Sequence, residues 1–131
     1  MRERPMRALL LVAIGGALGS VARFKLSGWV LHHAVSWRVP VGTFLVNVSG
    51  CLIAGVLAGM TAKHQGFSPD ARLLLFTGLL GGFTTFSAFG LETVLLMKRG
   101  EWLIALGNVV LSVSAALLAV WLGFFVTEAR S

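Results

Sequence analysis

Residues 81 to 89 read GGFTTFSAF, and they interrupt an apolar stretch that runs from Leu73 to Met97. Two adjacent glycines, two threonines and a serine are poor material for an uninterrupted helix that faces lipid. Glycine costs about 1 kcal/mol relative to alanine inside a helix, and Thr84 and Thr85 can turn their hydroxyl groups on the backbone. The stretch therefore predicts a break in a helix.

A break at this position matters for function. Inside a bilayer, backbone that lacks its helical hydrogen bonds is tolerated only where protein buries it or where it lines a watery cavity. The carbonyl and amide groups that such a break exposes are natural ligands for ions. The sequence thus indicates an ion site within this apolar segment.

The composition is that of an integral membrane protein. The 131 residues are 56% hydrophobic and only 12% charged, and a soluble domain needs more charge than this to cover its surface. A helical span requires about 20 apolar residues. Four spans are predicted, at about residues 8–31, 41–62, 71–97 and 102–126. They leave only short connections, so we expect one all-α transmembrane domain, with the third of its four helices broken near the middle.

The net charge of +6 could point to nucleic acid. Basic residues that flank apolar spans more often contact anionic lipid headgroups, so we expect a lipid bilayer as the partner and no nucleic acid. The first span, preceded by three arginines, also imitates a secretory signal. Its apolar run continues well past any cleavage point, which favours a membrane span.

The basic residues are divided almost evenly between the two sides of the membrane. Four spans place both termini and the loop after the second span on one side. That side carries six Lys or Arg residues and the other carries five: Arg2, Arg4, Arg7, Lys63, Arg72 and Arg130 against Arg23, Lys25, Arg38, Lys98 and Arg99. Because orientation follows the side with more positive residues, we predict insertion in both directions and antiparallel pairing with a second copy. A weak bias from the N-terminal arginines is the alternative.

Polar residues also occur within the first two spans. In the second span, Thr43, Asn47 and Cys51 share one helical face because they are four residues apart. Asn47 either makes an interhelical hydrogen bond or presents its NH2 group to a polar conduit. In the first span, Arg23 lies roughly 22 Å from the start of the helix. It either snorkels to the nearer interface or faces a vestibule that attracts anions.

The last two spans continue this pattern. If the helix resumes near Thr85, then Phe86, Phe89 and Glu92 lie along one ridge. Such aromatic stripes are usually packing, but this one is joined to an acid within the bilayer. In the fourth span, Ser112 follows Asn108 by one turn.

Pairs of small residues predict where helices approach closely. Three small-xxx-small pairs occur, at Gly15 with Gly19, Gly55 with Gly59, and Gly78 with Gly82. For Gly55 and Gly59 we expect packing without further function.

Three segments resemble the signature segments of the Fluc/CrcB family of bacterial fluoride channels. They are GGALGSVARF (15–24), GTFLVNVSGCLIAG (42–55) and GGFTTFSAFGLE (81–92). The chain length, the four spans and the order of the motifs agree over nearly the whole chain. The resemblance implies an antiparallel, dual-topology homodimer that passively exports fluoride across the bacterial inner membrane through two pores along the subunit interface.

The resemblance also implies roles for individual residues. A structural sodium ion on the dimer axis would be held by main-chain oxygens of Gly81 and Thr84 from both subunits. Phe86 and Phe89 match the paired phenylalanines that line the pores, and Asn47 matches the pore asparagine.

Further positions match the conduit, and one departs from the pattern. Thr43, Glu92 and Ser112 match its polar positions. Ala88 stands where the family usually has a hydroxyl residue, which could weaken or reroute the polar path, and the pattern does not single out Asn108.

The predicted pore residues are of the kind that a small anion requires. Fluoride holds its hydration strongly, so a pore must replace water with hydrogen-bond donors. Asn47 offers an NH2 group, Ser112 and Thr43 offer hydroxyls, and phenylalanine ring edges are electropositive. Neutral donors also bind weakly enough to let the ion leave.

Two other classes of membrane protein are alternatives. A small multidrug/proton antiporter also uses four spans and antiparallel dimers, but exchange needs a carboxylate that titrates within the membrane, and Glu92 is the only candidate. A non-transporting assembly protein, held together by its glycines, would carry no ion flux. We do not expect an enzyme, because no nucleophile with a paired base and no phosphate-binding loop is evident.

Overall fold

The computed structural model describes residues 3–34, 38–63 and 66–129, and every regular element within these ranges is a helix. In chain order the elements are α1 (Glu3–His33), α2 (Val41–Lys63), α3 (Pro69–Arg72), η1 (Leu73–Leu80), α4 (Gly81–Phe83), α5 (Phe86–Lys98) and α6 (Trp102–Ala129). Four segments are long and apolar enough to cross a membrane: α1, α2, the run from α3 to α5, and α6. Each predicted span lies within one of these segments.

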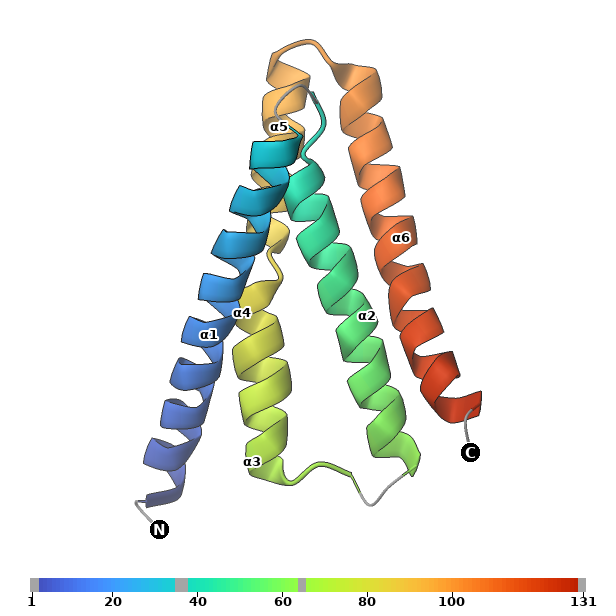
Figure 1. Ribbon diagram of the computed structural model, residues 1–131. Helices are drawn as coiled ribbons and strands as arrows, with labels where there is room; N and C mark the ends of the chain where they lie inside the picture. The colour runs from blue at the N-terminus through green and yellow to red at the C-terminus, as the bar shows by residue number, and fades with distance from the viewer. Residues whose placement is uncertain (1–2, 35–37, 64–65, 130–131) are drawn as a thin grey trace.

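The four segments form a bundle in which successive segments run in opposite directions. Figure 1 shows the start of α1 and the end of α6 at the same end of the bundle as the α2–α3 connection. The bundle has two packed pairs: α2 lies mainly against α6, and α1 lies mainly against η1 and α4. Arg2 and Arg130, which entered the charge count, lie outside the described residues.

Glycines allow α1 to approach the third segment so closely that the two main chains are in contact. A Cβ atom added to Gly15 would lie 2.5 Å from the Leu74 carbonyl oxygen, and one added to Gly19 would overlap the Leu79 carbonyl. Both approaches are closer than real Cβ contacts allow, so neither glycine can be replaced without moving main chain. The predicted close approach at this pair is confirmed.

The α2–α6 interface uses glycines in the same way. A Cβ on Gly55 would overlap the carbonyl of Val120, and one on Gly59 would overlap the side chain of Thr127. The second predicted pair is therefore also a close helix–helix contact.

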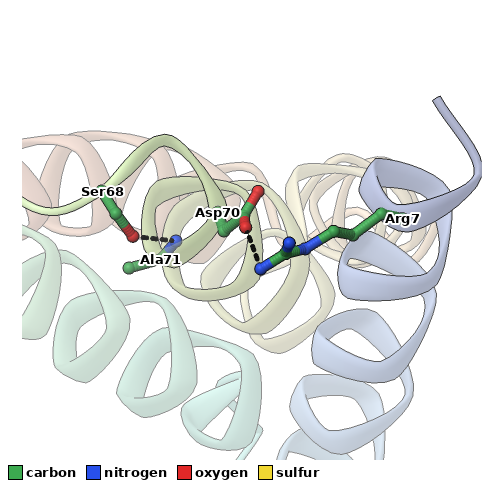
Figure 2. A network of polar contacts seen from close by, with 4 residues as sticks. All are labelled: Arg7, Ser68, Asp70 and Ala71. Carbon is green, nitrogen blue, oxygen red and sulfur yellow. Dashed lines mark hydrogen bonds and ion pairs between the residues drawn. The ribbon is translucent and has the colours of Figure 1, made fainter. Parts of the chain in front are cut away.

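The start of the third segment is tied to α1. The Ser68 Oγ accepts a hydrogen bond from the Ala71 amide at 3.2 Å and caps α3, with Pro69 in the first turn. Arg7 of α1 forms an ion pair with Asp70 (Figure 2). Because both side chains are substantially exposed, this pair adds little to stability and mainly orients the segment.

The third segment is broken at Thr84 and Thr85. Both residues are extended, with φ/ψ of −85°/154° and −148°/109°, and Figure 1 shows the irregular stretch between α4 and α5. The predicted break is confirmed and is narrower than the glycines suggested, since Gly81 and Gly82 remain helical.

The segment before the break is a π-helix, which the sequence did not predict. Over the eight residues of η1 the hydrogen bonds run from residue i to i+5, and the Gly81 amide continues this pattern by donating to the Phe76 carbonyl. Turns of this kind are rare and frequently occur at functional sites. The stretch LLLFTGLL has the composition of an ordinary apolar helix, so its residues do not signal the change.

Candidate functional site

Asn47 of α2 holds the break in place. Its Oδ1 accepts a hydrogen bond from the Thr85 amide at 2.8 Å, and its Nδ2 donates to the Thr85 carbonyl at 3.0 Å. Of the two interpretations of Asn47, the interhelical hydrogen bond is therefore present in the structure. An amide NH2 group carries two protons, and within the described residues the second proton has no partner.

Thr85 in turn caps α5. Its Oγ1 accepts a hydrogen bond from the Ala88 amide at 3.2 Å, as an N-cap residue does. Ala88 thus contributes its main-chain amide to the start of the helix, and its methyl group adds no hydroxyl to the site.

The break leaves the carbonyls of residues 81–84 without their usual helical donors. For Gly81 and Thr84 the loss follows from two amides that are diverted to other acceptors. In a continuous helix the Thr85 amide would donate to Gly81, and the Ala88 amide would donate to Thr84. Because the amides donate to Asn47 and to the Thr85 hydroxyl instead, the Gly81 and Thr84 carbonyls lose their helical donors. These are the main-chain oxygens that the resemblance assigns to sodium, so the site has the donor chemistry that a hard cation prefers.

Arg23 of α1 contacts the same break from the other side. Its Nε donates a hydrogen bond to the Gly82 carbonyl at 3.1 Å, and the side chain is half-buried. A cation at the C-terminal end of a helical segment compensates its exposed carbonyls. Arg23 was expected either at the membrane interface or in a vestibule; the structure places its Nε against the main chain of α4.

An open groove of about 300 Å³ lies beside the start of α5. Asn47 and Cys51 of α2, Phe86 and Phe89 of α5, and Ser112 of α6 are among the residues that line it. The two phenylalanine rings are in contact, with centroids 5.4 Å apart, and Phe86 is 82% exposed. The groove therefore gathers four of the predicted pore residues from three segments.

Thr43 and Glu92 lie outside this groove: Thr43 is one turn before Asn47 in α2, and Glu92 is about one turn after Phe89 in α5. The Thr43 hydroxyl donates to Glu92 Oε1 at 2.6 Å, while Glu92 Oε2 is buried without a hydrogen-bond partner in the described structure. Glu92 lines a second cavity of about 160 Å³, shared with Arg38 and Arg99. The structure thus pairs these two predicted residues with each other and separates them from the phenylalanines.

A buried polar pair behind the groove was only partly anticipated. Thr93 and Asn108 are each 6% exposed. The Asn108 Nδ2 donates to Thr93 Oγ1 at 2.9 Å, and the Ser112 hydroxyl donates to Asn108 Oδ1 at 3.3 Å. Thr93 was not a predicted site residue, although a hydroxyl one helical turn after Phe89 within an apolar span was a usable signal.

The four apolar segments, the third of them interrupted by a polar break, define a small multi-pass membrane protein. The sequence profile of the family described as "CrcB-like protein, Camphor Resistance (CrcB)" matches residues 10–124. The chain belongs to this family, as the three sequence segments indicated.

Relatives in several bacteria carry one name, "Fluoride-specific ion channel FluC". The protein of Methylobacillus flagellatus is 56% identical over 119 residues, covering 91% of this chain and 93% of the relative. The Rhizobium meliloti protein is 43% identical over 124 residues, covering 95% and 98%. That of Opitutus terrae is 49% identical over 120 residues, covering 90% of each chain. The family is one of ion channels and not of enzymes.

Proposed function

We propose that this protein is a fluoride channel that passively exports fluoride across the bacterial inner membrane. One observation carries the proposal: four residues from three segments line one groove beside the helix break, namely Asn47, Phe86, Phe89 and Ser112. Support comes from relatives up to 56% identical over nearly the whole chain that are named as fluoride-specific channels.

The groove offers neutral groups to an anion. The second N–H of the Asn47 amide and the electropositive ring edges of Phe86 and Phe89 can replace part of the hydration shell of fluoride. The cations Arg38 and Arg99 line a separate cavity. An anion held by neutral groups leaves more easily than one held by a buried cation, as conduction requires.

The proposal includes a second, antiparallel copy of the chain. The exposed ring of Phe86 and the exposed hydroxyl of Ser87 lie next to extended backbone in the middle of a membrane segment. Lipid cannot satisfy such backbone, so it must be buried in protein or line a watery cavity, and a second protein chain provides either environment. A two-fold partner covers it with the same surface, and the near-equal division of positive charge permits both orientations. One groove per chain then gives two pores per dimer.

A structural sodium ion fits the proposed dimer axis. The carbonyls of Gly81 and Thr84 have lost their helical donors, and the two chains together would supply four such oxygens. Gly81 is exposed and has open space in front of it, since an added Cβ would contact only the Phe76 carbonyl, at 3.7 Å. The ion would contribute a fixed positive charge and hold the two chains together.

The antiporter alternative is not favoured. If this chain were an antiporter, its relatives would be expected to be proton exchangers. They are named as fluoride channels instead. The first span, residues 8–31, contains no acid, and the Glu92 carboxylate is already bonded to Thr43.

The test is a fluoride-electrode measurement on the purified protein in liposomes loaded with potassium fluoride, with valinomycin to carry the counter-charge. We expect rapid fluoride efflux that does not depend on a proton gradient, and little chloride efflux in matched chloride-loaded liposomes. Proton-coupled efflux of an organic cation, or no fluoride efflux from folded protein, would overturn the proposal.

A further inference from the structure

A series of hydrogen bonds runs from Phe89 through Thr93 and Asn108 to Ser112, which lines the groove. The donors and acceptors in this series have a fixed direction. A carbonyl oxygen can only accept a hydrogen bond, so the Thr93 hydroxyl must donate its single proton to the Phe89 carbonyl, at 2.7 Å. Thr93 Oγ1 can then only accept from Asn108, which must turn its NH2 group toward Thr93. The Asn108 Oδ1 is thereby turned toward Ser112, and the Ser112 hydroxyl must donate to it.

This direction determines what Ser112 shows to the groove. A serine hydroxyl has one proton and two lone pairs. While the proton lies on Asn108 Oδ1, only lone pairs remain for the groove, and lone pairs repel an anion. For Ser112 to donate to fluoride, it must release Asn108 and leave a buried carbonyl oxygen without a donor.

We infer that Asn108 is a positioning residue that weakens the hold of the groove on fluoride by competing for the Ser112 proton, and that Thr93 sets its orientation. The inference rests on the proposed function. Neither residue needs to touch the anion, because both are 6% exposed and act through Ser112. Weak binding favours throughput, since an ion must leave as readily as it enters.

Two variants release the Ser112 proton by independent routes. Asn108→Leu removes the competing oxygen and suits a buried position next to an apolar cavity wall. Thr93→Val keeps Asn108 but removes the acceptor that fixes its amide, so the NH2 group can turn toward Ser112. One hydrogen bond corresponds to about three- to tenfold in an equilibrium constant. We therefore expect both variants to lower the half-saturating fluoride concentration by about that factor, with an equal or lower maximal rate.

Three controls separate this effect from a general change of structure. Thr93→Ser keeps the hydroxyl and should restore the wild-type half-saturating concentration. Ser112→Ala should abolish the effect, so that Asn108→Leu causes no further shift in that background. Ser114→Ala changes an exposed serine on another face of α6 and should leave the concentration dependence unchanged.

The measurement is fluoride flux against fluoride concentration in liposomes at constant ionic strength, with the thermal unfolding of each variant recorded in detergent. A half-saturating concentration that is unchanged in both folded variants would overturn the inference, as would an equal shift in the Ser112→Ala background. Because wild-type flux is measured in parallel, its absence would count against the proposed function, whereas unshifted variants of a conducting protein count only against the role of Asn108.

Discussion

At the scale of single residues, a substitution of Phe86, whose ring is exposed, tests the groove most directly. The ring lies against that of Phe89 at an interplanar angle of 39°, and both rings line the groove. An aliphatic side chain of similar bulk would keep the apolar contacts and lose the ring quadrupole that attracts an anion.

Phe86→Ile is therefore expected to lower fluoride efflux by at least about tenfold, which corresponds to about 1.4 kcal/mol at the barrier. The fold should survive, because Phe86 is 82% exposed in the protomer. The check is fluoride-electrode efflux together with size-exclusion chromatography. Wild-type flux from a folded Phe86→Ile protein would show that the ring does not line the pore.

Asn47 has a structural role that a leucine of similar size cannot take over. Asn47→Leu removes the partner of both main-chain groups of Thr85. Leaving these part-buried main-chain groups unsatisfied is expected to cost about 2 kcal/mol in total. The loss should appear as lower thermal stability in detergent. Ser49→Ala is the matched control on α2, because the Ser49 hydroxyl bonds only to its own helix; equal stability of the two variants would contradict the role of Asn47.

The sequence predicted which residues gather at the groove better than it predicted their partners. Asn47, Phe86, Phe89 and Ser112 were placed by helical spacing and resemblance, and the structure brings them together. The contact of Arg23 with Gly82 was not foreseen, because it joins residues 59 positions apart whose pairing depends on how α1 packs. Thr93 was missed because a hydroxyl in an apolar span can always bond to its own helix, as this one also does.

At the scale of elements, the position of the break depends on how α1 supports the third segment. The glycine face of α1 touches the main chain of η1, and Arg23 bonds to α4, so both contacts hold the part of the segment that precedes the break. The break and the four spans could be predicted because composition controls both: apolar length sets a span, and Thr84 and Thr85 favour extended backbone. The π-helical bonding of η1 could not, because it depends on tertiary packing that no single residue reports.

Gly19→Ala tests this support. The added methyl group would overlap the Leu79 carbonyl, and overpacking of this kind typically costs about 1–3 kcal/mol. We expect a lower unfolding temperature and a smaller yield of folded protein. Gly107→Ala is the control, because a Cβ there has no neighbour within 4 Å and alanine is the better helix former. A Gly19→Ala protein as stable as wild type would show that α1 can move away from η1 without loss.

At the scale of the whole molecule, the protomer alone leaves the region of the helix break only partly covered, with Phe86 and Ser87 exposed beside it. The extended pair Thr84 and Thr85 lies in the middle of a segment long enough to span the bilayer, and Gly81 beside it is exposed. A soluble protein could hydrate this region. In a membrane it must be buried in protein or line a watery cavity, and the proposed second copy in the opposite orientation would provide that cover.

Gly81→Val tests dimer formation separately from the folding of the protomer. Within one chain the new Cβ would meet only the Phe76 carbonyl, at an ordinary 3.7 Å, and valine is a better helix former than glycine. The protomer should therefore fold with unchanged helical content by circular dichroism. If the partner chain and the proposed sodium ion occupy the space in front of Gly81, the same variant should lose its dimer by light scattering and its fluoride flux. Gly28→Val, at a glycine whose added Cβ would have no neighbour within 4 Å, should remain dimeric. A dimeric, conducting Gly81→Val protein would move the interface and the ion away from the break.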